Sequence, residues 1–165
     1  MSHEVEIGRG KRGRRAYTLD DIALVPARRT RDPEDVNVGW QIDAYHVDIP
    51  LMAAPMDSVM SPETAIAFGR LGGIGVLDLD GLWTRYEDPE PILDQIAHLG
   101  EEESIATLQR VYSEPIKPSL ITERLTQLRE AGVVVAGKLS PQRVQQHWRA
   151  VVDAGVDLFI IRGST

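Results

Sequence analysis

Carboxylates follow short apolar runs at two places in the chain. The apolar residues 49–54 lead toward Asp57, and the apolar residues 74–77 lead into Asp78 and Asp80. Parallel α/β proteins bind their ligands at the carboxyl ends of strands, so both places are candidates for a binding edge. Asp78 and Asp80 could hold a sugar hydroxyl or a water there. The alternative is a solvated turn, and the sequence does not decide between the two.

Other common reaction centres are missing from the sequence. It contains no cysteine, which excludes disulfides and thiolate metal sites. The four histidines are scattered without metal-ligand spacing, so no metal site is predicted, and there is no P-loop, nucleophile elbow or G-x-G-x-x-G motif. The paired acids Asp20 and Asp21 could serve acid–base or metal chemistry. Two solvated acids at the start of a helical turn, with Thr18 as its cap, fit the pattern better.

A repeated pattern of strand, loop, helix and glycine positions the candidate residues. Apolar runs that predict buried strands begin near residues 49, 74, 133 and 156. Two predicted helices start with Ser-Pro, at Ser61 and Ser140, where serine is a good cap and proline suits the first turn. Another helix is predicted over residues 119–130. Repeated βα units of equal length indicate a parallel α/β architecture, as in a barrel.

The remaining segments divide the chain into parts. Residues 1–16 form a basic arm rich in glycine and arginine, which is predicted to be flexible, although it could also bind phosphate. Residues 17–48 are predicted to hold an opening segment and a hairpin whose turn lies at residues 43–46. Residues 49–165 contain the α/β pattern. Within them, residues 87–130 are helical in pattern and form the longest connection.

Two long motifs carry a resemblance to a known family. The segments YTLDDIALVPARRT (17–30) and PLMAAPMDSVMSPETAIAFGRLGGIGV (50–76) resemble the opening segments of the IMP dehydrogenase/GMP reductase family. That family has a His-Lys-Asn triplet where this chain has Asp78, Leu79 and Asp80, which is typical of its divergent bacterial branch without CBS domains. The resemblance implies an α/β fold, the first half (about four βα units) of a (β/α)8 TIM barrel, with the helical insertion in place of CBS domains.

The resemblance also implies a function. It implies an oxidoreductase of purine nucleotide metabolism that moves hydride between NAD or NADP and a purine nucleotide, namely IMP, GMP or XMP. Carried over by position, it implies substrate contacts from Ala54, Met56 and Asp57. It implies cofactor contacts from Gly137, Lys138, Arg162, Gly163 and Ser164. The family's nucleophilic cysteine comes later in the sequence, and a whole barrel needs about 250 residues, so we expect a fragment that is inactive alone and holds no catalytic residue.

Several alternatives remain open for these residues. Met56 could be a plain core residue, and Lys138 could be a solvated lysine in a turn after the third strand. Arg162 stands where dehydrogenases of the family place an aspartate that accepts hydrogen bonds from ribose hydroxyls. An arginine side chain cannot accept hydrogen bonds, but it could bind a phosphate. Together with Asp78 and Asp80, this departure favours a second interpretation, a non-catalytic nucleotide-binding or assembly paralogue. A flavin-dependent barrel is a third.

Charge and hydropathy limit the partners. The net charge is −7 and the basic residues gather near the N-terminus, so the acidic body argues against nucleic-acid binding. No apolar run approaches the roughly 20 residues of a membrane span, and the N-terminus lacks the apolar region of a secretory signal. We therefore expect a cytoplasmic protein without membrane or nucleic-acid partners. The resemblance implies that the intact protein is a homo-oligomer, a tetramer or larger.

Overall fold

The computed structural model describes residues 4–14, 16–23, 25 and 32–163. The chain divides into two compact units, residues 1–37 and residues 38–165. None of the described helices combines the length and the apolar character that a membrane crossing requires. Ser164, one of the predicted cofactor contacts, lies outside the described residues.

The first unit contains a short antiparallel hairpin. Strand β1 (Glu4–Glu6) pairs with β2 (Arg12–Arg14), and Gly8 and Gly10 adopt positive φ angles of 75° and 71° between them. Glycine enters this backbone region without a steric cost, so the residues that predict flexibility also permit a tight turn. The flexibility of the basic arm remains a prediction.

Two single turns of 3-10 helix follow in the same unit, η1 (Leu19–Asp21) and η2 (Pro33–Asp35). The backbone N–H and the hydroxyl of Thr18 both donate to Asp21 Oδ2, each at 3.0 Å. Thr18 stands at the start of the turn as predicted, because its carbonyl accepts from the Asp21 N–H at 3.1 Å. The side-chain contact runs from the Thr18 hydroxyl to the Asp21 carboxylate. The two hydrogen bonds to Asp21 Oδ2, the backbone one first, lower the pKa of Asp21.

The second unit opens with the predicted hairpin, formed by β3 (Trp40–Ile42) and β4 (Tyr45–Val47). Asp43 starts its turn with a positive φ of 48°. The predicted turn over residues 43–46 is too long, because Tyr45 already belongs to β4. Its hydroxyl donates to Asp157 Oδ1 at 2.7 Å, a long-range contact that local turn propensity does not reveal.

A parallel sheet forms the centre of this unit. Strands β5 (Val76–Asp78), β6 (Ala136–Leu139) and β7 (Leu158–Ile161) lie in that order and run in one direction. An isolated parallel bridge joins Met52 to Ile74, just before β5. The apolar run predicted as the first strand therefore lies beside β5 in the expected orientation.

The third predicted strand is displaced along the sequence. The apolar residues 133–136 predict it, but β6 begins at Ala136 and continues through Gly137 and Lys138. The prediction of a turn at Gly137 and Lys138 is wrong. The physical reason is that β6 extends to a polar end of the sheet, where Lys138 meets two carboxylates, so apolar residues do not mark its whole length.

Three helices cover one face of the sheet, namely α1 (Pro62–Arg70), α4 (Pro118–Glu130) and α5 (Pro141–Asp153). The strands contact α1 and α5 directly, and Leu125 and Leu128 of α4 belong to the same buried cluster as Leu77. Each of the three helices has proline in its first turn, where its missing N–H is not needed. Ser61 caps α1 as predicted, since its hydroxyl accepts from the Thr64 N–H at 3.1 Å.

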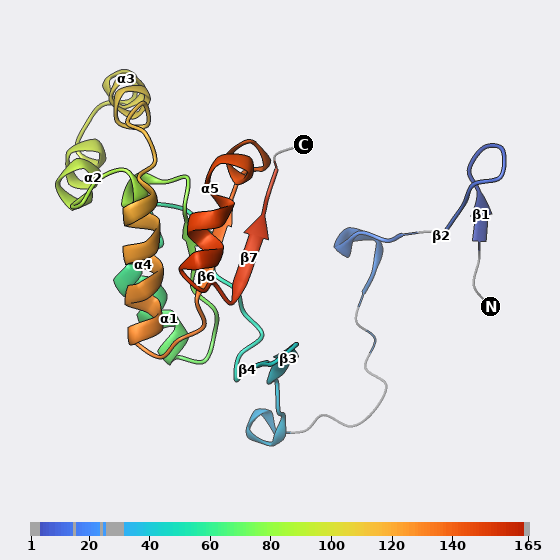
Figure 1. Ribbon diagram of the computed structural model, residues 1–165. Helices are drawn as coiled ribbons and strands as arrows, with labels where there is room; N and C mark the ends of the chain where they lie inside the picture. Colours follow the sequence, from blue (N-terminus) through green and yellow to red (C-terminus); the bar gives the residue numbers. More distant parts are fainter. Residues whose placement is uncertain (1–3, 15, 24, 26–31, 164–165) are drawn as a thin grey trace. The chain divides into compact units, whose positions relative to one another are not determined.

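The long connection between β5 and α4 also folds into helices. It holds η3 (Leu82–Thr84), α2 (Glu90–Ala97) and α3 (Glu101–Val111). In Figure 1, α2 and α3 lie toward the end at which β7 finishes, and the β3–β4 hairpin lies toward the opposite end. Helices α2 and α3, the part of the predicted insertion 87–130 that precedes α4, therefore lie near the carboxyl ends of the strands.

The two faces of the sheet carry different layers, because successive strand residues point to opposite sides. The face under the helices is built from residues at most 1% exposed: Leu77, Leu79, Val135 and Leu139. On the other face, Val76 and Ala136 cluster with Val47 of the hairpin. Two positions further along the same face, Asp78 stands opposite Lys138. One end of this face is thus apolar and the other is polar.

Gly75 marks a close approach between α1 and the sheet. A Cβ atom at Gly75 would lie 2.5 Å from Ala65 Cα and 2.7 Å from its carbonyl oxygen, both backbone atoms. We expect Gly75→Ala to lower the free energy of unfolding by about 1–3 kcal/mol, because the helix must move. Gly100→Ala, at a position with open space, should change it by less than about 1 kcal/mol. Urea unfolding measures both, and equal midpoints for the two variants would contradict this packing.

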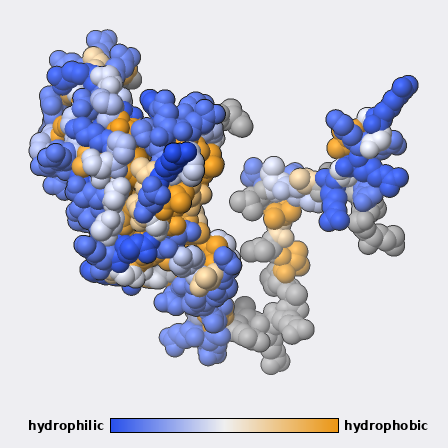
Figure 2. Space-filling model, viewed as in Figure 1, coloured by the Kyte–Doolittle hydropathy of each residue, from blue (hydrophilic) through white to orange (hydrophobic). Residues whose placement is uncertain are grey.

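The described part of the sheet leaves two edges without a neighbouring strand, one beyond residues 51–53 and one beyond β7. Figure 2 shows hydrophobic atoms gathered where β7 lies. Leu51 and Ile161 are each 56% exposed. Such edges are templates for association. We expect the 165-residue chain alone to self-associate or to melt over a broad range. Size-exclusion chromatography with light scattering tests this, and a sharply melting monomer of 18.3 kDa would contradict it.

Candidate functional site

A lysine lies between two aspartates where β5 and β6 end. Lys138 Nζ is 3.2 Å from Asp78 Oδ1 and 3.1 Å from Asp80 Oδ2. All three side chains are less than a fifth exposed. The parallel register brings them together, because Asp78 and Lys138 are cross-strand neighbours. The Ser140 N–H donates to Asp80 Oδ2 at 2.7 Å, so the start of α5 is held by the same cluster.

Burial and ion pairing act against each other in this cluster. Burial raises the pKa of the Asp78 carboxyl, while the Asp80 N–H and the Lys138 ammonium oppose the rise. Burial alone would lower the pKa of Lys138, but the attraction of Asp78 and Asp80 outweighs it and raises the pKa. Lys138 is therefore charged at neutral pH and holds together two carboxylates that would otherwise repel each other.

Asp57 joins the loop after the first predicted strand to the segment after β5. Its Oδ2 accepts from the Leu82 N–H at 2.7 Å and from the Tyr112 hydroxyl at 2.5 Å. Burial raises the pKa of Asp57, and the hydrogen bonds from Tyr112 and Leu82 oppose the rise. Oδ1 lies so close to Gly81 that a Cβ there would be 2.0 Å from it. Asp57 therefore fixes both loops, and Gly81 leaves the space that Asp57 needs.

A buried arginine ties the helical insertion to the same end of the sheet. Arg85 is 4% exposed, and its Nε and Nη2 donate to the Asp80 carbonyl at 3.1 and 2.9 Å. Its Nη1 donates to the Glu114 carbonyl. The guanidinium carbon is 5.5 Å from the centroid of the Tyr112 ring, within the range of cation–π attraction. The end of α3 is thereby held next to Asp57 and Asp80.

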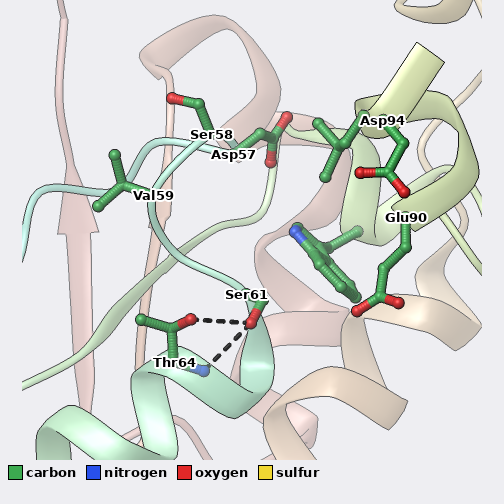
Figure 3. Close-up of a pocket in the computed structure, with 9 residues that line it drawn as sticks. Asp57, Ser58, Val59, Ser61, Thr64, Glu90 and Asp94 are labelled. Carbon is green, nitrogen blue, oxygen red and sulfur yellow. Dashed lines mark hydrogen bonds between the residues drawn. The ribbon is translucent and has the colours of Figure 1, made fainter. Parts of the chain in front are cut away.

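Two cavities open at this end of the sheet. One has a volume of about 450 Å³ and is lined by Met56, Asp57 and Asp78 together with apolar side chains of α2 and α3. The other has a volume of about 400 Å³ and is shown in Figure 3, where Asp57 lies across from Glu90 and Asp94 of α2. Both volumes fall in the range of small-molecule sites. Among the described side chains, no group of three or more His, Asp or Glu residues could hold a metal ion.

The predicted substrate contacts are only partly brought together. Met56 and Asp57 line the larger cavity beside Asp78. Met56 is 47% exposed, so its interpretation as a plain core residue is wrong. Ala54 is exposed on the same loop but is not among the residues that line either cavity.

The predicted cofactor contacts are divided between two environments. Gly137 faces the helices, where a Cβ atom would lie 2.6 Å from Leu79 Cδ1, so the glycine is explained by packing. Lys138 is 14% exposed and ion-paired, so its interpretation as a solvated loop lysine is wrong. Arg162 and Gly163 follow β7 and are exposed. Their roles as cofactor contacts remain predictions.

Sequence patterns miss two residues of this site, Tyr112 and Arg85. Helical periodicity places Tyr112 at the end of a helix but cannot bring it against Asp57, which is 55 positions earlier. Arg85 lies in a polar stretch between a predicted strand and a predicted helix, where an arginine is ordinary. Only Gly81 offers a hint, since a glycine after two acids predicts a turn.

Removal of the central cation tests the ion cluster. We expect Lys138→Met to lower the free energy of unfolding by roughly 2–4 kcal/mol near neutral pH, because two buried carboxylates lose their partner. Without Lys138 the pKa of Asp78 rises further. An acid whose folded pKa is raised costs stability above that pKa and not below it, so the loss should shrink toward mildly acidic pH.

The control for this prediction is Lys117→Met, which breaks an exposed pair with Glu114 at 3.7 Å. This substitution should lower the free energy of unfolding by less than about 1 kcal/mol. Chemical denaturation at neutral and at mildly acidic pH measures both variants. Two results would contradict the buried ion cluster. In one, Lys138→Met lowers the free energy of unfolding by no more than Lys117→Met does. In the other, the loss of free energy for Lys138→Met grows on acidification.

The chain matches known proteins along nearly all of its length. Residues 16–165 match the model of the IMP dehydrogenase / GMP reductase domain. An uncharacterized oxidoreductase of Mycolicibacterium smegmatis is 43% identical over 165 residues, which cover 97% of this chain and 44% of that protein. An inosine-5'-monophosphate dehydrogenase of Methanocaldococcus jannaschii is 42% identical over 64 residues, which cover 39% of this chain and 13% of that protein.

A solved structure shows the same arrangement of the backbone. The IMP dehydrogenase/GMP reductase-like protein of Corynebacterium glutamicum has a TM-score of 0.81 and 41% identity, over 97% of this chain and 44% of that chain. This chain thus spans less than half the length of its full-length matches. The motif resemblance and the α/β fold are confirmed by these matches. The chain belongs to the IMP dehydrogenase/GMP reductase family.

Proposed function

We propose that this chain is part of an oxidoreductase that transfers hydride between a nicotinamide dinucleotide and a purine nucleotide. The observation that carries the proposal is the position of the family's opening motif, whose Met56 and Asp57 line a cavity together with Asp78 at the carboxyl ends of parallel strands. Relatives named as an oxidoreductase and as inosine-5'-monophosphate dehydrogenase support the reaction class. The proposed substrate is IMP, GMP or XMP, with Ala54, Met56 and Asp57 as its contacts.

In the proposed reaction, the residues of this chain bind and orient the substrate and do not transfer protons. Lys138 is charged and shared between two carboxylates, so it is not poised to take a proton from a ligand. Its role in the proposal is to hold Asp78 and Asp80 at the cavity end of the sheet. The nucleophile is proposed to lie outside the 165 residues, in keeping with the absence of cysteine from them.

The residues present fit NAD or NADP only in part. Gly137 faces the helices and Lys138 is engaged by its ion pairs, so neither suits a dinucleotide contact. Arg162 is exposed after β7, and its guanidinium could pair with a phosphate oxygen. We propose Arg162 and Gly163 as the contacts that the described chain offers to the cofactor, and assign no step of the reaction to them.

A second candidate function is a non-catalytic paralogue that binds a nucleotide or assembles with relatives. The observation that favours it is the closed ion cluster of Asp78, Asp80 and Lys138. Asp78, Leu79 and Asp80 stand where the resembled enzymes have a His-Lys-Asn triplet, whose lysine contributes to catalysis. Such a cluster stabilises the fold without supplying a group for proton transfer.

We also propose that the intact protein acts in the cytoplasm as a homo-oligomer, a tetramer or larger, without nucleic-acid or membrane partners. The net charge of −7 supports the absence of a nucleic-acid partner, because phosphate backbones require basic surfaces. The exposed apolar residues at both edges of the described sheet support assembly into a larger body.

Expression of the whole reading frame that contains this chain tests the proposed reaction. We expect IMP with NAD⁺ or NADP⁺, or XMP or GMP with the reduced cofactor, to change the nicotinamide absorbance. Asp78→Asn should lower kcat/KM by about tenfold or more, because the cluster loses a charge at the cavity. The matched control Asp35→Asn, at an exposed position in η2, should leave it unchanged.

The outcomes separate the candidates. Turnover that falls in Asp78→Asn alone supports the oxidoreductase. Tight nucleotide binding without turnover in the whole protein supports the paralogue. Neither binding nor turnover of any of the three nucleotides would overturn both.

A further inference from the structure

The cavity of about 400 Å³ that Figure 3 shows lies against α2, and we call it the α2 cavity. Trp83 of η3 lines it together with Glu90 and Asp94 of α2, and none of these three residues lines the larger cavity. Met56 lines only the larger one, and Asp57 is shared between the two. The α2 cavity is therefore a second place at which a ligand could bind.

Carboxylates give the α2 cavity a negative lining. Glu90 and Asp94 are four positions apart on α2, so their like charges lie on the same side of the helix and repel each other. In Figure 3 both carboxylates extend toward the cavity, and Asp57 lies across from them. The described lining contains no Lys, Arg or His, and neither Glu90 nor Asp94 has an ion-pair partner among the described residues. The lining therefore attracts a cation.

The arrangement of these acids favours an organic cation over a metal ion. Among the described side chains, no three acidic or histidine groups come together in a way that could hold a metal ion. The carboxylates are thus spread along the cavity and do not converge on one point. Ammonium and guanidinium groups carry several N–H donors, which can reach more than one carboxylate at a time.

One buried donor and one buried acceptor in the lining have no partner. Trp83 is 7% exposed, and its Nε1–H forms no hydrogen bond within the described part of the chain. The same holds for the buried Oδ1 atom of Asp57. Buried polar groups are nearly always hydrogen-bonded, because an unpaired group loses its bonds to water without compensation. Both residues line the α2 cavity, so a ligand there can supply the missing acceptor and the missing donor.

The indole of Trp83 is held in position before a ligand arrives. Arg124 is 5% exposed, and its Nε donates to the Trp83 carbonyl at 3.1 Å. Its guanidinium carbon is 5.7 Å from the centroid of the indole ring. A ring that is already fixed does not have to be ordered on binding, so less binding free energy is lost. The unpaired Nε1–H is therefore a fixed feature of the cavity.

We propose that the α2 cavity binds a small organic cation that also carries an amide group. The guanidinium or ammonium end of the ligand pairs with Glu90 and Asp94. The amide carbonyl accepts from Trp83 Nε1–H, and the amide N–H donates to Asp57 Oδ1. The aliphatic stem between the two ends packs against Leu93, which is half-buried in the lining. This inference goes beyond the proposed function and does not rest on it.

Three related compounds test the chemistry of the ligand. The whole protein is titrated in a calorimeter with argininamide and with agmatine, which lacks only the carboxamide. The third compound is citrullinamide, in which a neutral urea group replaces the guanidinium. We expect argininamide to bind, and agmatine and citrullinamide to bind about tenfold or more weakly, because each lacks one of the two groups that the lining requires.

Nuclear magnetic resonance reports on Trp83 directly. The whole protein is labelled with ¹⁵N-tryptophan, and the Nε1–H signal of Trp83 is identified by its loss in Trp83→Phe. We expect this signal to shift with argininamide, while those of Trp40 and Trp148, which are each 43% exposed and do not line the cavity, stay in place. In Trp83→Phe, argininamide and agmatine should bind with nearly equal affinity, because the donor to the amide carbonyl is gone.

A matched pair of double substitutions tests the role of charge. Glu90→Gln combined with Asp94→Asn should weaken the binding of argininamide by about tenfold or more. The control, Glu102→Gln combined with Glu103→Gln, removes the same charge from exposed positions on α3 that do not line the cavity. Both variants are expected to fold, because the first relieves a repulsion within α2 and the second changes only exposed side chains.

The results separate this inference from the proposed reaction. A Trp83 shift with argininamide, together with weaker binding in the α2 variant alone, supports the inference even where the whole protein shows no hydride transfer. A Trp83 signal unmoved by millimolar argininamide overturns it, and so does equal affinity of the unaltered protein for argininamide and agmatine. Equal weakening by the two double substitutions overturns it as well. None of these results excludes hydride transfer, which the absorbance assay decides on its own.

Discussion

The register between β5 and β6 is the constraint on which the rest of this structure depends. It places Asp78 directly opposite Lys138 and, two positions earlier, Val76 opposite Ala136. Because side chains alternate along a strand, this single register makes one end of a sheet face apolar and the other polar. A slip by one residue would turn Lys138 toward the helices and bury it against leucines. The ion cluster can therefore form only when β5 and β6 pair in this register.

The two ends of the sheet are closed by different means. At the apolar end, Val47 of the hairpin covers Val76 and Ala136, and Tyr45 holds Asp157. At the polar end, helices α2 and α3 cover the sheet. They are held there by the hydrogen bonds of Arg85 to the Asp80 and Glu114 carbonyls and by the hydrogen bond from Tyr112 to Asp57. The close apolar packing at the first end is expected where no ligand binds. At the polar end, the hydrogen-bonded groups surround a cavity that could hold a ligand. This asymmetry is the physical basis for placing the candidate site at the carboxyl ends of the strands.

Much of the fold follows from the sequence, because local signals mark its elements. Ser61 and Pro62 define the start of α1. The apolar runs predict four parallel strand regions, of which the described structure forms three as strands, while the first contributes an isolated bridge from Met52 to Ile74. The limits of β6 do not follow, because Lys138 belongs to a strand only through its partners on β5. Thr18 begins its turn as predicted, but the bond from its hydroxyl to the Asp21 carboxylate does not follow from the pattern.

The candidate site follows from the sequence only where a motif contains it. Met56 and Asp57 lie in the family's opening motif and do line a cavity. Tyr112 and Arg85 are brought there by contacts between distant segments, and neither periodicity nor composition reveals such contacts. Gly137 matches a turn by position, yet it lies within β6, and the space for it is set by packing against Leu79. Its role as a cofactor contact remains a prediction.

Hydrogen–deuterium exchange with and without IMP tests the central claim, that ligands bind at the polar end of this sheet, most directly. We expect slower exchange in peptides from residues 54–60, 78–84 and 108–114 when IMP is bound. A cavity of about 240 Å³ at the opposite end, lined by residues such as Val47, Gly73 and Val134, serves as the internal comparison. Protection confined to that opposite cavity, with no change at the polar end, would contradict the account.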